Sequence, residues 1–182
     1  MAFKELLLAA ILTWPAPWYP PGRPNPETSD GYKLRVATIA EAVVIESRDV
    51  NDWGLGRRAL VAATLTLWYS ETRFSYEVHA LGTSRWGQDV GKARCLGQLH
   101  TSKLVPKSEW EQTVGADLEA TRRCARATMR VIAAMARMCS ATEATPHHMA
   151  RVFAAYGSGR GCELSAQAQR RAQRWQRLMA RI

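Results

Sequence analysis

Helical periodicity runs through most of this sequence, and it constrains the chain to an all-α architecture. No alternation of apolar and polar residues interrupts the pattern after residue 29, so no β-sheet is expected. At 182 residues the chain is long enough to bury one core, and we predict a single domain over residues 31–182. Apolar residues recur every three or four positions in five segments, which are the predicted helices: 32–46, 55–70, 116–138, 146–156 and 165–181.

Residues 1–30 are predicted to be an N-terminal arm with a short helix and a segment rich in Pro and Trp. The apolar run 6–12 indicates the helix, and the prolines between 15 and 26 favour an extended path after it. Glu5 and the lack of a small-residue cleavage site argue against an export signal. Three aromatic side chains are expected to hold the arm on the domain: Trp14, Trp18 and Tyr19.

Positive charge is concentrated in the C-terminal third of the chain. Residues 120–182 hold 12 arginines and two acids, whereas residues 1–119 hold 13 basic and 14 acidic residues, within a total of +9. Such a surface suits a polyanion, for example nucleic acid, anionic lipid or bacterial cell wall. The last predicted helix either presents its arginines to an anionic wall or membrane surface, or packs on the domain with a solvated arginine face.

Neither the cysteines nor the paired histidines predict a metal site. The cysteines lack the CxxC spacing of structural zinc, and they allow three disulfide pairings or four buried thiols. His147 and His148 have no HExxH motif or acidic cluster beside them, so they indicate a solvated first helical turn. The four cysteines are Cys95, Cys124, Cys139 and Cys162.

Glu71 is the candidate catalytic residue. It follows the most apolar predicted helix, where a carboxyl group is partly removed from water. Desolvation favours a protonated carboxyl group, which is the form that a general acid for a glycosidic oxygen requires. The structural alternative is an exposed glutamate at a helix C-terminus.

Three short motifs follow one another along the chain. They are Glu-Thr-Arg-Phe at 71–74, Cys-Leu-Gly-Gln-Leu at 95–99 and, after a long predicted helix, Phe-Ala-Ala-Tyr-Gly-Ser-Gly-Arg-Gly at 153–161. This order resembles the soluble lytic transglycosylase and goose-type lysozyme superfamily, in which Glu-Ser-x-Phe, Gly-Leu-Met-Gln-Ile/Leu and Ala-Ala-Tyr-Asn-Ala-Gly-x-Gly occur in that order. The resemblance covers about residues 55–161 and implies a lysozyme-like all-α fold, and the chain is also similar to compact Arg-rich proteins of bacteriophages and prophages.

The resemblance implies a role for each matching residue. Glu71 becomes the catalytic acid, Thr72 replaces the family's serine, and Phe74 holds the first motif in place. Gln98 lines the substrate cleft, and Tyr156 directs its hydroxyl toward Glu71 or the sugar. Gly159 and Gly161 are expected to let the backbone approach the glycan closely, and Gly157 is a further candidate for substrate binding.

Three positions depart from the family motifs, and several tryptophans are further candidates for the cleft. Cys95 stands where the family has Gly, Gly97 where it has Met, and Gly157 where it has an Asn whose amide contacts substrate. Tryptophans either stack on sugar rings or belong to the core; the candidates are Trp53, Trp110 and, favoured by its place in the polar segment 73–106, Trp86.

The number of available carboxylates bears on the reaction. Glycosidases commonly use two, and goose-type hydrolases often place an Asp where this chain has His100. The resemblance therefore implies the one-acid reaction of a lytic transglycosylase on the MurNAc-β-1,4-GlcNAc bond, with a 1,6-anhydro product and no cofactor. One alternative is a hydrolase, a muramidase or endolysin, with Asp89 as second acid. The other is a basic helical protein that binds nucleic acid or builds a virion.

The resemblance also bears on the cysteines and on where the protein works. In the implied fold, Cys139 and Cys162 both neighbour the cleft, and Cys95 faces the first half of the long helix that contains Cys124. Disulfides Cys139–Cys162 and Cys95–Cys124 are therefore expected, as suits an enzyme outside the reducing cytosol. We expect a monomer that acts on bacterial peptidoglycan in the periplasm or outside the cell, whether secreted, released by lysis or carried by a virion.

Overall fold

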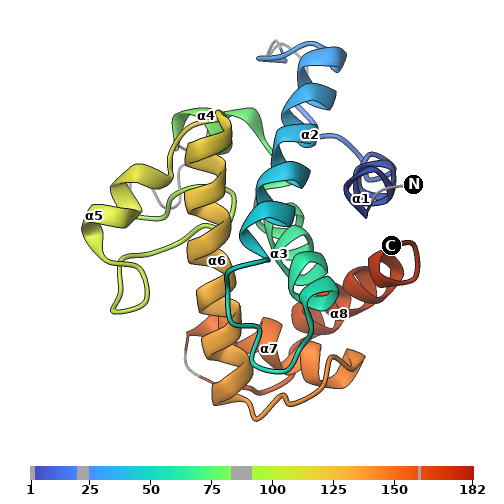
Figure 1. Ribbon diagram of the computed structural model, residues 1–182, viewed down its shortest axis with the longest axis vertical. Helices are drawn as coiled ribbons and strands as arrows, with labels where there is room; N and C mark the ends of the chain where they lie inside the picture. Colours follow the sequence, from blue (N-terminus) through green and yellow to red (C-terminus); the bar gives the residue numbers. More distant parts are fainter. Residues whose placement is uncertain (1–2, 20–24, 83–91, 160) are drawn as a thin grey trace.

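The computed structural model describes residues 3–19, 25–82, 92–159 and 161–182, and this part of the chain is helical, without a β-strand. An isolated bridge joins Arg94 to Leu99. The all-α prediction is therefore confirmed. The elements, shown in Figure 1, are α1 (Phe3–Ile11), α2 (Ser29–Glu46), α3 (Arg57–Thr72), α4 (Tyr76–Leu81), α5 (Lys107–Trp110) with a 3₁₀ turn (Glu111–Thr113), α6 (Leu118–Met138), α7 (Pro146–Ser158) and α8 (Ala166–Met179).

Side-chain caps define where the main helices begin. Thr28, Asp117, Thr145 and Ser165 each accept a hydrogen bond from the backbone N–H three residues on, at the starts of α2, α6, α7 and α8. All five predicted helices are present. The second one begins and ends two residues later than predicted, so that Glu71 and Thr72 lie in its last turn rather than after it.

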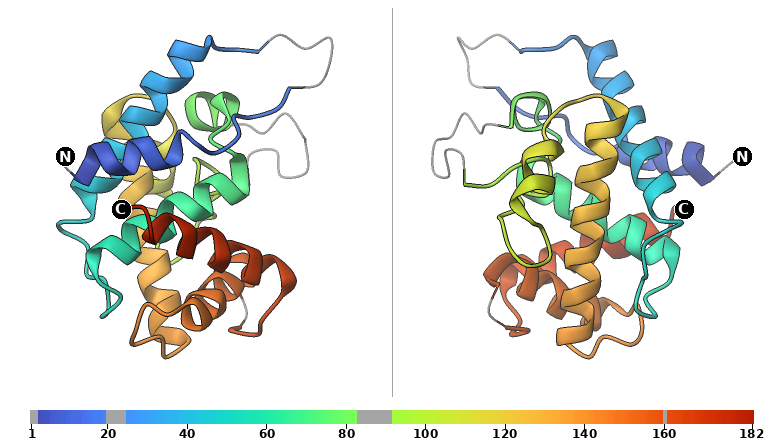
Figure 2. Two further views of the ribbon diagram at one scale, coloured as in Figure 1. Left: turned by 90° about the vertical axis from the view of Figure 1, so that its right-hand side faces the viewer. Right: turned by 60° about the vertical axis from the view of Figure 1, so that its left-hand side comes forward.

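Helix α3 lies in the middle of the molecule, and every residue from 59 to 69 is buried. It packs against α8, α6 and α2, while α7 packs against both α6 and α8 (Figures 1 and 2). A helix that is apolar on all sides is a buried helix, as its sequence indicates. The last turn of α3 leaves this core, and its residues become half-buried.

Side chains of residues 3–19 pack on the same core. Leu7 and Ile11 of α1 are fully buried, and the Trp14 ring lies 4.7 Å from the Tyr69 ring. The Tyr19 hydroxyl donates a hydrogen bond to Glu77 (3.2 Å). The prediction for Trp18 is wrong, because its side chain is 64% exposed and does not hold the arm.

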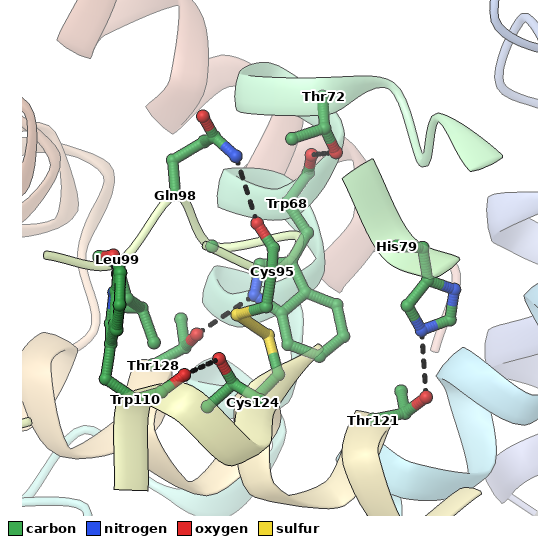
Figure 3. The surroundings of a disulfide bond; sticks show 12 residues. Trp68, Thr72, His79, Cys95, Gln98, Leu99, Trp110, Thr121, Cys124 and Thr128 are labelled. Atoms are coloured by element: carbon green, nitrogen blue, oxygen red, sulfur yellow. Dashed lines mark hydrogen bonds between the residues drawn. A yellow bond between two sulfur atoms is a disulfide. The ribbon is translucent and has the colours of Figure 1, made fainter. Parts of the chain in front are cut away.

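Helix α4 was expected to be part of an irregular polar segment. At six residues it is too short to show a helical period, yet it brings His79 into a buried position. Arg35 donates to His79 Nδ1 (3.3 Å), so Nε2 carries the proton and donates to Thr121 Oγ1 (2.8 Å; Figure 3). Burial, reinforced by the charge of Arg35, lowers the pKa of His79 to about 3. The imidazole is therefore neutral in the folded protein.

All four cysteines form disulfides, Cys95–Cys124 and Cys139–Cys162. These are the two pairs that the resemblance implies, and the chain has no free thiol. The first bond joins the 95–99 loop to α6 (Figure 3), and the second joins the end of α6 to the segment between α7 and α8. Over the described ranges, no helix combines the length and apolar character needed to cross a bilayer.

Candidate active site

Glu71 lies at the C-terminal end of α3, where the chain leaves the core. Arg73 ends the helix in the left-handed conformation (φ 50°), and Phe74 continues in it (φ 55°). Two contacts hold this unfavourable turn: the fully buried Phe74 ring packs 5.6 Å from the Tyr69 ring, and Arg35 donates to the Phe74 carbonyl (2.8 Å). Phe74 thus fixes the position of the Glu71 segment. The Thr72 hydroxyl donates to the Trp68 carbonyl (2.8 Å), which commits it to the helix end (Figure 3).

The Glu71 carboxylate forms an ion pair with Arg171 of α8. Nη2 of Arg171 donates to Oε1, across 100 residues of sequence. The Glu71 side chain is 23% exposed, whereas Arg171 is 4% exposed at its side chain. The sequence predicted a carboxyl group that burial alone would leave protonated. In the structure a buried cation compensates the charge of the half-buried carboxylate instead.

Sequence reasoning missed Arg171, because it assigned all the arginines of the last helix to a solvated face. A signal was nevertheless present. Arg171 falls within the i, i+3, i+4 pattern of the buried α8 side chains Ala168, Ala172, Trp175 and Leu178. A charged residue at a position facing the core requires a partner there, and Glu71 is that partner.

Tyr156 connects the third motif with the second. Its hydroxyl donates a hydrogen bond to the Gly97 carbonyl oxygen (2.6 Å). Burial raises the pKa of Tyr156 and the negative charge of Glu71 raises it further, so the phenol is neutral. Its hydroxyl is directed at the Gly97 carbonyl, whereas the resemblance implies that it is directed at Glu71 or the sugar.

The 95–99 loop is tightly constrained. Cys95 and Gln98 both have positive φ angles (54° and 48°), a conformation that costs energy for any residue with a Cβ. The Arg94–Leu99 bridge and the Cys95–Cys124 disulfide hold the two ends of the loop. The Gln98 amide donates to the Cys95 carbonyl (3.1 Å), so its nitrogen supports the loop itself (Figure 3).

The small residue at position 97 is a packing requirement. A Cβ on Gly97 would lie 2.5 Å from Thr128 Oγ1 and 3.1 Å from the Tyr156 hydroxyl. Thr128 accepts a hydrogen bond from the Trp68 indole N–H (3.0 Å), so it is not free to move away. The methionine of the family motif would not fit against these groups.

The glycine at position 157 has a comparable explanation. A Cβ on Gly157 would lie 3.2 Å from Nη1 of Arg171, so this glycine leaves space for the guanidinium that reaches Glu71. The asparagine of the family motif would compete for that space. The predicted end of this helix is wrong: α7 continues through Gly157 and Ser158, and Gly159 ends it in the left-handed conformation (φ 64°).

Two predicted site residues, Trp86 and Asp89, lie outside the described residues. Trp110 is a core residue whose indole N–H donates to the Leu99 carbonyl (2.6 Å). Trp53 is 45% exposed and lies under Arg137, 5.0 Å from ring to guanidinium. In both cases the contacts are with segments other than the Glu71 turn.

A recess of about 190 Å³ adjoins Arg171 of the ion pair, and a carboxylate outside the three motifs lies in its wall. Its lining includes Arg171, Gly157, Ser158 and Glu163. Glu163 thus lines the same recess as Arg171, the residue that pairs with Glu71. His148 contacts the Glu143 carbonyl through Nδ1 (3.0 Å), and the described ranges contain no cluster of three His, Cys, Asp or Glu residues suited to a metal.

The arrangement brings parts of all three motifs together. Glu71 is paired with Arg171, Arg171 packs against Gly157, and the neighbouring Tyr156 holds Gly97. Comparison of the chain with protein-family models, curated proteins and solved structures finds no match. The contacts around Glu71 are therefore the main basis for a functional proposal.

Proposed function

We propose that the protein is a lytic transglycosylase that cleaves the MurNAc-β-1,4-GlcNAc bond of peptidoglycan, with Glu71 as its acid and base. The observation that carries this proposal is the chain of contacts that links three segments, 71–74, 95–99 and 153–161: Glu71 pairs with Arg171, Arg171 packs against Gly157, and the neighbouring Tyr156 donates to Gly97. Nothing in the packing of an all-α core requires a carboxylate, a phenol and a strained glutamine loop to be linked in this way. A lysozyme-like arrangement of the helices is part of the proposal.

The proposed reaction starts from the protonated form of Glu71, which takes a proton from solvent at Oε2 because Arg171 binds Oε1. Glu71 donates this proton to the glycosidic oxygen as the bond to muramyl C1 breaks, and the N-acetyl group of the same sugar assists at C1. The Glu71 carboxylate then takes the proton of the muramyl O6 hydroxyl as O6 bonds to C1. The product is a 1,6-anhydro sugar, and Glu71 is protonated again. Because Arg171 binds Oε1, both transfers are assigned to Oε2.

The neutral Tyr156 hydroxyl and the backbone of Gly97 form one edge of the proposed site. Their hydrogen bond fixes the distance between α7 and the 95–99 loop, and Tyr156 keeps its proton because burial and the charge of Glu71 raise its pKa. Since that proton is donated to the Gly97 carbonyl, the phenol oxygen is left to accept a hydrogen bond from a sugar hydroxyl. No cofactor takes part in the proposed reaction.

The test is mass spectrometry of the muropeptides released from purified cell walls. The wild-type protein is expected to release anhydro ends, which are lighter than reducing ends by one water. Glu71→Gln keeps the shape of the side chain but removes its proton, and it should release them roughly 10²- to 10⁴-fold more slowly. The matched control is Glu143→Gln, at an exposed glutamate in the α6–α7 connection.

Three outcomes would contradict the proposal. A Glu71→Gln protein with more than half of the wild-type rate would remove Glu71 from the chemistry. Reducing ends would show hydrolysis, in which case Asp89 and Glu163 are the acids to replace next. Release of no muropeptide by folded wild-type protein would exclude the activity itself.

The proposed place of action is the periplasm or the exterior of the cell, and the proposed state is a monomer. Two disulfides and no free thiol support a compartment in which thiols are oxidised. Gel filtration of the oxidised protein tests the second point.

A further inference from the structure

A groove of about 590 Å³ lies between the C-terminal end of α3, the end of α1 and the exposed side of α8. Figure 2 shows α8 crossing α3 with α1 above it. Thr13, Trp14 and Tyr69 form part of its wall. Six arginines line the groove: Arg73, Arg170, Arg171, Arg174, Arg177 and Arg181.

Most of this positive charge has no acidic partner. Within the described ranges only Arg171 of the six forms an ion pair with a carboxylate. Arg174 donates to the Ser70 hydroxyl (2.8 Å), and Arg181 donates to the Thr13 hydroxyl (2.7 Å). These neutral partners fix the guanidinium groups without compensating their charge.

The arginines also repel one another. Burial, followed by the charges of Arg177, Arg73 and Arg171, lowers the pKa of Arg174. Nε of Arg171 is buried and has no hydrogen-bond partner within the described residues. An anion in the groove would relieve the repulsion among these charges.

The shape of this cluster indicates a linear anion. Arg170, Arg174 and Arg177 follow one another at intervals of four and three residues, so they mark one side of α8 over roughly 10 Å. Arg181 continues the row two residues after the end of α8. A single phosphate would engage only one or two of them. A chain of phosphodiesters can engage the whole row.

Two observations argue against a lipid bilayer and against nucleic acid as the polyanion that the groove binds. The apolar side chains of α8 are buried against the protein, so this helix has no free apolar face to insert into a bilayer. The Tyr69 ring has Trp14 at 4.7 Å and the Arg174 guanidinium at 4.9 Å, so it is not open to stack on a nucleic-acid base. The groove is built to contact phosphates rather than lipid tails or bases.

We propose that this groove binds a linear polyol-phosphate polymer, the chemical class of the phosphodiester chains found in bacterial cell walls. The choice of a wall polymer rests on the proposed function. Arg171 lines the groove and also contacts Glu71, so one side chain connects the groove with the proposed catalytic carboxylate. The groove thereby directs the enzyme to glycan that carries anionic polymer.

The test is calorimetric titration of the wild-type protein with poly(glycerol phosphate) at several salt concentrations. Arg170→Gln/Arg177→Gln removes two groove charges and leaves the Glu71–Arg171 pair intact. We expect its affinity to be about tenfold weaker, and the slope of log K against log salt to be shallower by about 1.4. The matched control is Arg48→Gln/Arg58→Gln, at two exposed arginines outside the groove, which should bind within about twofold of wild type. Circular dichroism establishes that all three proteins are folded.

Equal losses in the two double variants, or no binding by folded wild-type protein, would overturn the proposal. Tighter binding of oligo(dT) with the same number of phosphates, or equal binding to phosphatidylglycerol vesicles, would overturn the choice of polymer. The titration needs no bond cleavage. Polymer binding without muropeptide release would therefore refute the proposed function alone, and release without binding would refute this inference alone.

Discussion

Replacing Arg171 with methionine should destabilise the protein more than any other single loss of charge on α8. Methionine keeps much of the buried stem but leaves the Glu71 carboxylate without its cation. Breaking a fully buried pair costs about 3–5 kcal/mol. Because the Glu71 side chain is 23% exposed, water compensates part of this, and we expect about 2–3 kcal/mol.

The measurement is urea unfolding of the oxidised protein, followed by circular dichroism. For a chain of 182 residues the expected loss corresponds to a fall in Tm of about 5–10 °C. The control is Arg123→Met, which breaks the exposed pair of Arg123 with Glu119 and should cost less than about 1 kcal/mol.

A double-mutant cycle identifies the cause. Glu71→Gln in the Arg171→Met background removes the uncompensated charge, so the double variant should recover about 1–2 kcal/mol relative to the sum of the single losses. If the two losses simply add, or if Arg171→Met costs no more than Arg123→Met, the ion pair does not stabilise the end of α3 as argued.

Three further predictions concern the surroundings of the site. Gly97→Ala should lower the free energy of unfolding in urea by about 1–3 kcal/mol, because the new Cβ would lie 2.5 Å from Thr128 Oγ1. Its control is Gly161→Ala, whose Cβ meets no atom within 4 Å and which should be nearly neutral. Equal effects of the two substitutions would contradict the packing argument. The pKa of His79 is 6.5 in the unfolded chain and about 3 in the folded protein, so the unfolded chain binds the proton more readily. The free energy of unfolding should therefore fall by up to about 1.4 kcal/mol per pH unit as the pH drops from 6.5 to 3. A His79→Gln protein with the same slope would refute this prediction. Replacing both Cys139 and Cys162 with serine should lower the free energy of unfolding by about 3 kcal/mol, and an unchanged Tm would show that this bridge does not stabilise the fold.

The main helices could be predicted from the sequence because each buries an apolar stripe that recurs at helical spacing. Helix α3 is the clearest case, since it is buried on all sides. Short elements could not be predicted in the same way: α4 has six residues, and its burial depends on Arg35 and Thr121 from distant helices. Helical periodicity shows which face of a segment must be buried, but it does not show which other segments bury that face.

The candidate site was predictable as a set of motifs but not as a set of contacts. The order of the motifs indicated Glu71, Gln98 and Tyr156, and in the structure the Tyr156 hydroxyl donates to Gly97, within the second motif. The partner of Glu71 could not be inferred, because Arg171 is one of several arginines in its helix. Gly157, which the motif comparison treated as the loss of a substrate contact, is explained by the space that this arginine needs.

The ion pair between α3 and α8 also bears on the order in which the protein matures during synthesis. A nascent chain that has emerged only as far as α7 already contains Glu71, Gln98 and Tyr156, but not Arg171. Its acid would stand at the end of α3 without a cation, and α3 would lack one of the helices that cover it. The carboxylate is therefore held in position only after the last helix has docked. Because translation runs from the N-terminus, the Glu71 site is completed only when α8 has emerged and docked, after the three motifs have been made.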